Sequence, residues 1–189
     1  MDDSPPKRSA EADRVLVEAA ARGSREAFDE LVRRHQAAIV NLVRVLTSGH
    51  GDAEDLAQDV FVRAWKSLRT FRGDSAFRTW LHRVAINVVR TDQAKRGKAR
   101  RLFRQPQEQD PEPPAVDAPV DAHLARRQVI DRALATLPDE LRTAVTLRDL
   151  QGLDYREIAS LLGVPIGTVE SRIFRARQRL KPLLAALVK

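Results

Sequence analysis

Polar and aromatic side chains gather on one side of a predicted helix in the last quarter of the chain. Pro165 starts this helix, and a rotation of about 100° per residue places Val169 and Ile173 on its apolar side. The residues on the opposite side are Glu170, Ser171, Phe174, Arg175 and Gln178. Guanidinium, amide and hydroxyl groups can read base edges in a major groove, and flanking arginines meet phosphates. The chemistry that this side can perform is therefore non-covalent recognition of duplex DNA.

Phe174 distinguishes this side from that of an ordinary surface helix. An exposed phenylalanine lowers solubility unless a ligand covers it, and thymine methyl groups or sugars are suitable partners. For any single arginine of the helix, an ordinary surface position in an arginine-rich protein remains the alternative.

A helix-turn-helix over residues 154–180 would position this side. Asp154 and Glu157 predict a capping box at the start of the first helix. Gly163 suits the left-handed position that ends that helix, and Pro165 restarts the chain as the second helix. The residues predicted to be buried are Ile158, Ala159, Leu161, Leu162, Val169, Ile173, Ala176 and Leu180.

Composition restricts the class of protein. With 189 residues the chain can form one large or two small domains, and only 5% aromatic residues favour small helical bundles. The chain contains no cysteine, and its four histidines lack the spacing of metal ligands, so we expect no metal and no cofactor. The sequence lacks a signal peptide and the apolar run of about 18 residues that a membrane span needs, so we expect a cytoplasmic protein.

Charge and proline content divide the chain. Residues 97–122 hold five prolines and 4 basic against 5 acidic residues, whereas residues 1–96 carry 17 against 14 and residues 123–189 carry 12 against 7. Two basic segments suit a polyanion that is contacted at both ends. We predict an all-α fold of two small helical domains, 11–96 and 123–189, after a disordered tail over 1–10. A flexible Pro-rich linker joins the domains, and the second contains the helix-turn-helix.

The first domain is expected to begin with two helices. The first ends at Gly23, Ser24 caps the second, and a turn follows over Thr47–Gly51. His35 lies on the apolar stripe of the second helix, where we expect a core or boundary residue and not a ligand. The other stripe residues are Val15, Leu16, Ala19 and Ala20 in the first helix, and Phe28, Leu31, Val32, Ile39, Leu42 and Leu46 in the second.

Asp52 opens a third helix that has two different sides. The apolar side holds Ala57, Val60, Phe61, Ala64 and Leu68. The other side holds Asp55, Gln58, Asp59, Val62 and Lys66, with Trp65 at its margin. A solvated side, whose acidic first turn suits the helix dipole, is one interpretation. Because apolar and aromatic residues among acids and an amide are typical of interface anchors, the spacing favours a protein-binding surface.

A loop over residues 71–75 and a fourth helix offer a second pattern. Gly73 breaks the third helix, and Asp74 or Ser75 can cap the fourth. The fourth helix is expected to bury Phe77 or Trp80 with Leu81, Val84, Ala85 and Val88, and to present Arg78, Arg83, Asn87 and Arg90. Aromatic, cationic and amide groups together suit single-stranded nucleic acid. The alternative puts both aromatics in the core and makes Asn87 a helix-to-helix hydrogen bond, and the residues alone do not decide.

Two long segments resemble one protein family. The run from Glu26 to Arg96, with DAEDLAQDVFVRAW and FRGDSAFRTWLHRVAIN, resembles the second conserved region of bacterial sigma factors of the extracytoplasmic-function (ECF) group. LPDELRTAVTLRDLQGLDYREIASLLGVPIGTVESRIFRARQRL resembles their fourth region. The resemblance covers about residues 12–184, and two independent motifs in the expected order make it specific.

The resemblance implies roles for the surfaces of the first domain. In that family the third helix binds a coiled coil of the polymerase β′ subunit, which implies this role for Asp55, Gln58, Asp59 and Trp65. The loop and the fourth helix hold the melted non-template strand of the −10 promoter element. This implies DNA contacts for Phe71, Arg78, Trp80 and Asn87, with core packing an equal alternative for Trp80.

The resemblance also implies that the helix after Pro165 reads the −35 promoter element as duplex. The matching positions are Thr168, Glu170, Ser171, Arg172, Phe174, Arg175 and Gln178. Glu170 departs from the lysine or arginine that relatives often carry. A carboxylate suits neither phosphate nor guanine, which leaves cytosine N4 as its partner.

For the linker, the resemblance implies a path through the polymerase, with acidic residues imitating RNA charge. These acids are Asp110, Glu112 and Asp117, and the basic residues before them, Arg100, Arg101 and Arg104, extend the basic surface of the first domain. The implied partners are core RNA polymerase through its β′ and β subunits, promoter DNA and an anti-sigma factor.

Two helices are predicted between the linker and the helix-turn-helix. One runs from Ala122 and the other from Leu137-Pro138 to Gly152. Their core residues are Leu124, Val129, Ile130, Ala133 and Leu134, then Leu141, Val145 and Leu150. The apolar tail, Pro182 to Lys189, either packs on this domain or binds a partner.

We interpret the chain as a promoter-specificity subunit that acts by binding, without covalent chemistry. A stand-alone helix-turn-helix regulator is the first alternative, but it gives the Asp55 side and the Phe71 loop no role. An enzyme is the second alternative. The sequence offers no metal-ligand spacing, glycine-rich phosphate loop or nucleophile-base pair for one.

Overall fold

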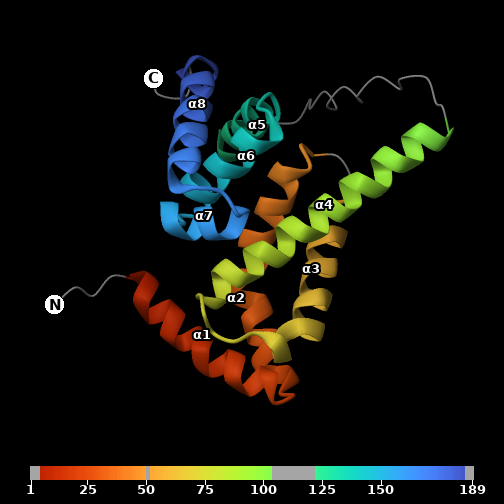
Figure 1. Cartoon of the computed structure of the whole chain (residues 1–189), viewed down its shortest axis with the longest axis vertical. Helices are drawn as coiled ribbons and strands as arrows, with labels where there is room; N and C mark the ends of the chain where they lie inside the picture. Colours follow the sequence, from red (N-terminus) through yellow and green to blue (C-terminus); the bar gives the residue numbers. More distant parts are fainter. Residues whose placement is uncertain (1–4, 50–51, 104–121, 186–189) are drawn as a thin grey trace.

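A computed structural model describes residues 5–49, 52–103 and 122–185, and the regular structure in these ranges is entirely helical (Figure 1). The first domain consists of α1 (Pro5–Ala21), α2 (Arg25–Leu46), α3 (Ala53–Ser67), a 3-10 turn η1 (Leu68–Thr70) and α4 (Phe77–Phe103). The second domain consists of α5 (Ala122–Ala135), α6 (Asp139–Val145), a π-helical turn η2 (Thr146–Leu150), α7 (Tyr155–Leu162) and α8 (Ile166–Leu184). The predicted all-α class is confirmed.

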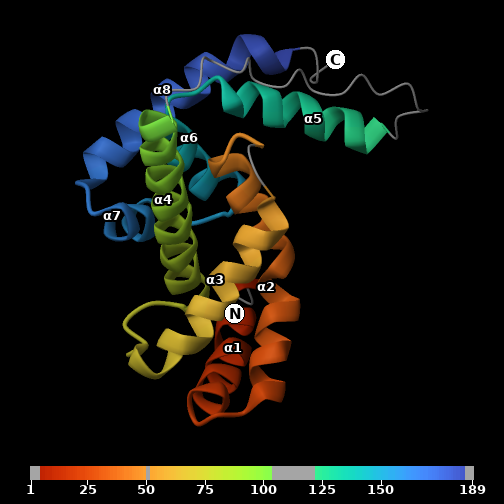
Figure 2. The same cartoon turned by 90° about the vertical axis from the view of Figure 1, so that its right-hand side faces the viewer.

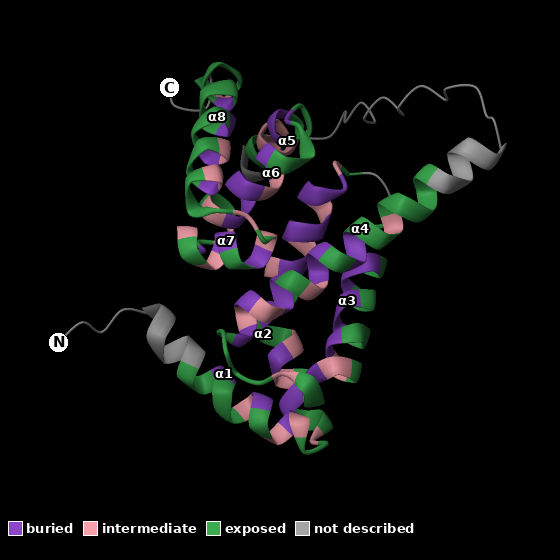
Figure 3. Cartoon of the chain, viewed as in Figure 1, coloured by how far each residue is buried: buried purple, intermediate pink, exposed green. Residues whose placement is uncertain are grey.

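Helices α4 and α2 both pack against the second domain: α4 adjoins α7, whereas α2 adjoins α5, α6 and η2 (Figure 2). The predicted apolar row of α4, which includes Leu81, Ala85 and Val88, is buried. A second row, His82, Ile86 and Val89, is buried as well, so most of the first half of α4 is enclosed (Figure 3). One continuous cluster of buried side chains therefore includes residues of both domains.

Helix α1 differs from its prediction at both its start and its buried side. It begins at Pro5, so the tail predicted to be disordered over residues 1–10 is helical from Pro5 onward, while residues 1–4 lie outside the described ranges. Proline suits a first helical turn because its missing N–H would have no partner there. The buried side holds Asp13, Val17 and Ala20, and Val15 is 65% exposed.

Asp13 explains how α1 is rotated. Its Oδ2 lies 2.7 Å from Nε2 of His35 on α2, and its Oδ1 accepts a hydrogen bond of 3.3 Å from Arg34. His35 is buried against the Phe77 ring, at 5.4 Å between centroids. The prediction that His35 is a packed core residue is confirmed. Because its partner Asp13 faces α2, α1 is rotated relative to the predicted orientation and buries a different row of side chains.

The predicted caps of α2 and α3 are present. Ser24 accepts a hydrogen bond of 3.2 Å from the N–H of Ala27, and Asp52 accepts one of 2.8 Å from that of Glu54. Helix α4 begins at Phe77, so neither Asp74 nor Ser75 stands immediately before it. Gly73 takes a φ of 77° in the loop, as a turn there requires.

The predicted linker over residues 97–122 begins too early. Helix α4 continues to Phe103, because the lysine, alanine, arginines and leucine that follow Gly97 are good helix formers. Helix α5 begins at Ala122, near the expected boundary. Arg104 and the acidic residues Asp110, Glu112 and Asp117 lie outside the described residues.

The second domain follows the predicted helix-turn-helix closely. Asp154 accepts a hydrogen bond of 2.8 Å from the N–H of Glu157, whose carboxylate accepts one of 2.9 Å from the N–H of Asp154. Gly163 adopts the left-handed conformation, with a φ of 68°. Val169, Ile173, Ala176 and Leu180 are buried.

The prediction that Leu150 is a core residue of the second domain is wrong. Leu150 is 49% exposed, and Leu147 is buried in its place, because the π-helical turn shifts the register by which side chains face the core. At the chain end, α8 continues past Pro182, where Leu184 packs on the core and Leu183 is 46% exposed. The predicted tail residues 186–189 lie outside the described ranges.

Replacing Asp13 with Asn is expected to destabilise the chain in a pH-dependent way. Burial raises the pKa of Asp13, but the hydrogen bonds and charges of His35 and Arg34 outweigh it and hold this pKa below its ordinary value. At neutral pH, Asp13→Asn should lower the free energy of unfolding by about 1 to 3 kcal/mol. Because the folded-state pKa is lowered, this advantage of the natural residue is present above pH 3.8 and is lost as the pH falls further.

Urea unfolding of the natural chain and of Asp13→Asn, from neutral pH to below pH 3.8, measures the difference between their free energies of unfolding. Glu18→Gln provides the control, because Glu18 is an exposed acid of the same helix. A stability difference between natural chain and Asp13→Asn that stays constant to the lowest pH would contradict the role of the charge.

Candidate protein and nucleic-acid interfaces

Helix α8 presents the side that the sequence predicts. Glu170, Ser171, Phe174, Arg175 and Gln178 are all exposed, and Thr168 is half-buried in the first turn. Phe174 is 64% exposed, although the opposite side of α8 is fully packed. Ile166, which the sequence analysis missed, adds an apolar side chain at the start of the helix, 41% exposed. The capping box of α7 and the Gly163 turn fix the direction from which α8 emerges.

Two arginines that flank the exposed side of α8 form ion pairs with acidic residues of the same chain. Arg172 donates a hydrogen bond of 2.6 Å to Glu140 on α6, and its side chain is only 16% exposed. Arg177 donates two hydrogen bonds to Asp149, of 2.6 and 3.1 Å, and these raise its pKa. Arg175 instead donates to the backbone oxygen of Ser171 and remains exposed. Arg172 is therefore the one predicted contact that turns away from the exposed side of α8.

The polar side of α3 borders an apolar hollow. Asp55, Gln58 and Asp59 are exposed, Val62 is 45% exposed, and Trp65 is half-buried. The Trp65 ring lies 4.9 Å from that of Phe28 on α2. The hollow has a volume of about 350 Å³, and its lining residues are Arg25, Phe28, Asp29, Gln58, Phe61, Val62 and Trp65. The sequence did not predict that α2 lines part of this hollow, because helical periodicity describes one helix at a time.

Three aromatic rings meet at the start of α4. Phe71 lies 5.1 Å from Trp80 and 6.3 Å from Phe77, and the last two rings are 5.6 Å apart. Phe77 is buried, whereas Phe71 and Trp80 are half-buried. The structure thus resolves the choice between Phe77 and Trp80 as the core residue: Phe77 is the core residue, and Trp80 covers it from outside.

A second hollow separates this loop from α1. It has a volume of about 750 Å³ and is lined by Glu11, Arg14, Val17, Glu18, Phe71, Arg72, Gly73, Ser75, Ala76 and Phe77. Phe71 and Arg72 form one wall, and α1 forms the other.

The polar groups of α4 point toward the second domain. Arg78 donates a hydrogen bond of 3.3 Å to the backbone oxygen of Gln151, and Arg83 donates one of 3.3 Å to that of Ser160. Thr79, which is buried, donates one of 2.7 Å to Glu157. Of the predicted DNA contacts on α4, Arg78 is thus engaged within the chain, whereas Asn87 is exposed.

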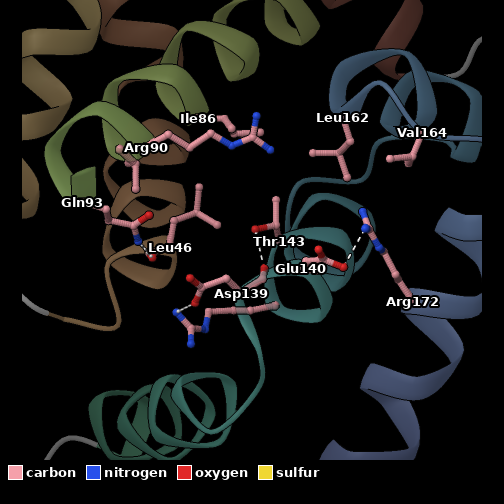
Figure 4. A pocket seen from close by; sticks show the side chains of 12 residues that line it. Leu46, Ile86, Arg90, Gln93, Asp139, Glu140, Thr143, Leu162, Val164 and Arg172 are labelled. Atoms are coloured by element: carbon pink, nitrogen blue, oxygen red, sulfur yellow. Dashed lines mark hydrogen bonds and ion pairs between the residues drawn. The ribbon is translucent and has the colours of Figure 1, made fainter. Parts of the chain in front are cut away.

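A cavity of about 350 Å³ remains between the domains (Figure 4). Arg90 extends from α4 into it, with Ile86 nearby, while Leu162 and Val164 form the opposite wall. The Arg172–Glu140 pair lies on the second-domain side, and the Nε2 of Gln93 donates to the backbone oxygen of Leu46 on the first-domain side.

Two features of other protein classes are not found among the described residues. Among residues 5–49, 52–103 and 122–185, no three histidines or acids are placed to hold a metal ion. Within the same ranges, no helix is long and apolar enough to cross a membrane.

Comparisons with known proteins agree on one family. Residues 31–101 match Sigma-70 region 2, and residues 127–180 match Sigma-70 region 4. The ECF RNA polymerase sigma-E factor of Escherichia coli (strain K12) is 38% identical over 194 residues, which cover 94% of this chain and 96% of that protein. The RNA polymerase sigma-H factor of Pseudomonas aeruginosa is 38% identical over 192 residues, which cover 95% and 97%.

Solved structures agree with the sequence relatives. CnrH, in complex with the cytosolic domain of CnrY, superposes with a TM-score of 0.68 at 34% identity, over 93% of this chain and 98% of that one. The sigma factor RpoE of Bartonella quintana, in complex with the anti-sigma factor NepR, superposes with a TM-score of 0.70 at 30% identity, over 84% and 96%. The chain therefore belongs to the extracytoplasmic-function group of RNA polymerase sigma factors, which act in transcription initiation by binding and not by catalysis.

Proposed function

We propose that this ECF sigma factor carries core RNA polymerase to promoters that it reads at two places. The first domain binds polymerase and holds the −10 element as a melted single strand. The second domain binds the −35 element as duplex. Because the chain favours the melted strand over the paired one, differential affinity drives opening.

The exposed side of α8 is the observation that carries the proposal. Phe174 keeps 64% of its surface accessible on a helix whose other side is packed, and exposed Ser171, Arg175 and Gln178 surround it. A major groove offers thymine methyl groups to the ring and base edges to the polar groups. Glu170 lies at the edge of this exposed side, where its carboxylate can accept a hydrogen bond from the amino group of a cytosine. We therefore expect this chain to prefer cytosine to guanine at the base pair that Glu170 contacts.

The hollow between α2 and α3 supports the assignment of the polymerase surface. An apolar floor formed by Phe28, Val62 and Trp65, with Asp55 and Asp59 beside it, fits a basic helix of a partner with apolar anchors. We assign this surface to the coiled coil of the β′ subunit, and we assign contacts with the β subunit to the second domain.

The aromatic cluster supports capture of a single strand. Phe71 and Trp80 are half-buried and lie 5.1 Å apart, and an unpaired base gains from stacking on aromatic side chains. Exposed Asn87 offers an amide that can read a base edge. Two of the similar structures are complexes with a second protein, and one of these is a sigma factor bound to an anti-sigma factor. We propose a regulator of that kind here.

Transcription in vitro tests the proposal directly. Core polymerase without any sigma factor is given a fragmented genomic library, and RNA 5′ ends are sequenced with and without this protein. The expected result is a set of protein-dependent starts that share two spaced upstream elements. Intact duplex binding without new starts would instead identify a stand-alone regulator.

Arg175→Ala should relax the reading of the −35 element. Loss of a guanidinium that contacts a base edge is expected to reduce discrimination between −35 variants by about 1 to 3 kcal/mol. Competition between promoter variants in the same assay measures it. Arg179→Ala is the matched control, because it removes an equal charge from the same helix but should weaken all variants alike. Equal behaviour of the two arginine variants would remove Arg175 from the assignment.

Asn87→Ala should impair promoter opening without disturbing the fold. The side chain is exposed, so stability should change by less than about 0.5 kcal/mol. Opening, followed by permanganate reactivity of unpaired thymines, should fall about tenfold. Polymerase binding, measured by fluorescence anisotropy, should stay unchanged. A parallel loss of binding and opening would indicate a structural role for Asn87.

A further inference from the structure

We infer that Asp13 on α1 and His35 on α2 are positioning residues for capture of the melted −10 strand, although both side chains are buried. They fix the aromatic cluster, which consists of Phe71, Phe77 and Trp80 and on which the proposed function places an unpaired base. The inference therefore rests on that function. It adds two residues that hold the stacking rings in place without contacting DNA.

Asp13 is the one buried carboxylate in the part of the chain whose side-chain burial the structure describes. It is 3% exposed, and its Oδ2 lies 2.7 Å from Nε2 of His35, which is 7% exposed. A carboxylate is costly to bury even when it is hydrogen-bonded, and an apolar side chain would fill the same space without that cost. Stability alone therefore does not account for a polar pair at this place.

The pair adds direction to the packing of α1 on α2. Apolar contacts between two helices are non-directional, whereas a hydrogen bond weakens steeply as its angle departs from a straight line. The Asp13 carboxylate is held from a second side, because its Oδ1 accepts a hydrogen bond of 3.3 Å from Arg34. Contacts with two successive residues of α2 thus fix the rotation of α1 and the plane of the His35 ring.

The His35 ring connects this pair to the aromatic cluster. Its centroid lies 5.4 Å from that of Phe77, with 62° between the ring planes. Phe77 is 5% exposed and lies 5.6 Å from Trp80 and 6.3 Å from Phe71. The two half-buried rings thus pack on Phe77, which packs on His35. Because core side chains are packed as closely as molecules in organic crystals, a displaced His35 ring would displace the other rings in turn.

Helix α1 reaches the Phe71 loop by a second route. Besides α2, it packs against η1 and α4, which are the elements on either side of that loop. Val17 lies one turn after Asp13 and lines the hollow of about 750 Å³ on the wall opposite Phe71. A rotation of α1 would therefore change the width of this hollow as well as the support of Phe77.

A positioning role and a purely structural role affect different steps. A structural change lowers the amount of folded chain, so it affects polymerase binding, duplex binding and opening alike. A displaced aromatic cluster weakens only the stacking of the unpaired base, which forms during opening. The pair should therefore affect the opening rate at saturating holoenzyme, and not the holoenzyme concentration that gives half this rate.

Opening kinetics of the complete holoenzyme test the inference. Core polymerase carrying each variant is mixed, over a range of concentrations, with a promoter found in the transcription experiment, and unpaired thymines are followed by permanganate reactivity. Asp13→Ala removes the hydrogen bond to His35. Because part of a base-stacking contact is lost, its maximal opening rate should fall about threefold to tenfold, with the half-saturating concentration within about twofold of the natural value.

Two control variants separate position from stability. Asp13→Asn keeps an amide of the same shape, which can still form a hydrogen bond with His35. Ser24→Ala removes the cap of α2, about 16 Å from His35 along the helix axis. Both changes should lower the free energy of unfolding, yet both variants should open the promoter within about twofold of the natural rate.

The natural opening rate in Asp13→Ala would overturn the inference, as would equal losses in Asp13→Ala and either control. Both results would leave the proposed function intact. Failure of the natural chain to open any promoter would overturn the proposed function and the inference with it.

Phe77→Leu tests the path through which the pair acts. This variant keeps an apolar core side chain but removes the ring between His35 and the two half-buried rings. Its opening rate should fall as in Asp13→Ala, and the double variant should lose no more than the larger single loss, because both changes act through one ring. Val43→Ala, at a fully buried position of α2, is the core control and should open the promoter at the natural rate.

Losses that multiply in the double variant would contradict transmission through Phe77. If Asp13→Ala fails to fold, the natural opening rate in Phe77→Leu overturns the inference by itself.

Discussion

Burial of α4 on two sides is the constraint on which the rest of this structure depends. One row of its side chains completes the core of the first domain, and the row through His82, Ile86 and Val89 faces the second domain. A helix that is apolar over most of its circumference must be covered over most of it. Only a narrow polar stripe is left, and the groups that suit a nucleic-acid strand share that stripe with the groups that bind the second domain.

The exposed sides of α8 and α3 do not depend on contacts between the two domains. Helix α8 packs Val169, Ile173 and Ala176 on one side, so its other side projects outward whatever the first domain does. Helix α3 is fixed by its Asp52 cap and by the α2 residues that complete its hollow. Two of the proposed binding surfaces thus lie on helix sides that are exposed in the folded chain.

Sequence patterns correctly predicted the features that depend on interactions between neighbouring residues. The capping box of Asp154 and Glu157, the left-handed Gly163 and the stripe of α2 each involve neighbouring residues, and each is present. The same patterns could not reveal contacts between distant segments. The hydrogen bond between Asp13 and His35 turned α1 and exposed Val15, and the register shift of the π-helical turn exchanged Leu147 for Leu150.

The candidate sites follow the same division. The exposed sides of α3 and α8 could be derived from helical periodicity, whereas the part of α2 in the hollow and the engagement of Arg78 and Arg172 depend on packing between helices. The apolar residues around Ile86 and Val89, interrupted only by Asn87, did carry a signal of two-sided burial. Periodicity alone does not say which second body covers such a run.

The ion pairs of α8 have a consequence for the ionic strength at which duplex binding persists. Arg172 and Arg177 are neutralised by Glu140 and Asp149, each at 2.6 Å, before any phosphate arrives. A cation that exchanges an internal carboxylate for a phosphate neutralises that phosphate but uncovers a negative charge on the protein. Fewer small ions are then released overall than the number of arginines on α8 suggests, and affinity for duplex falls less steeply as salt is added.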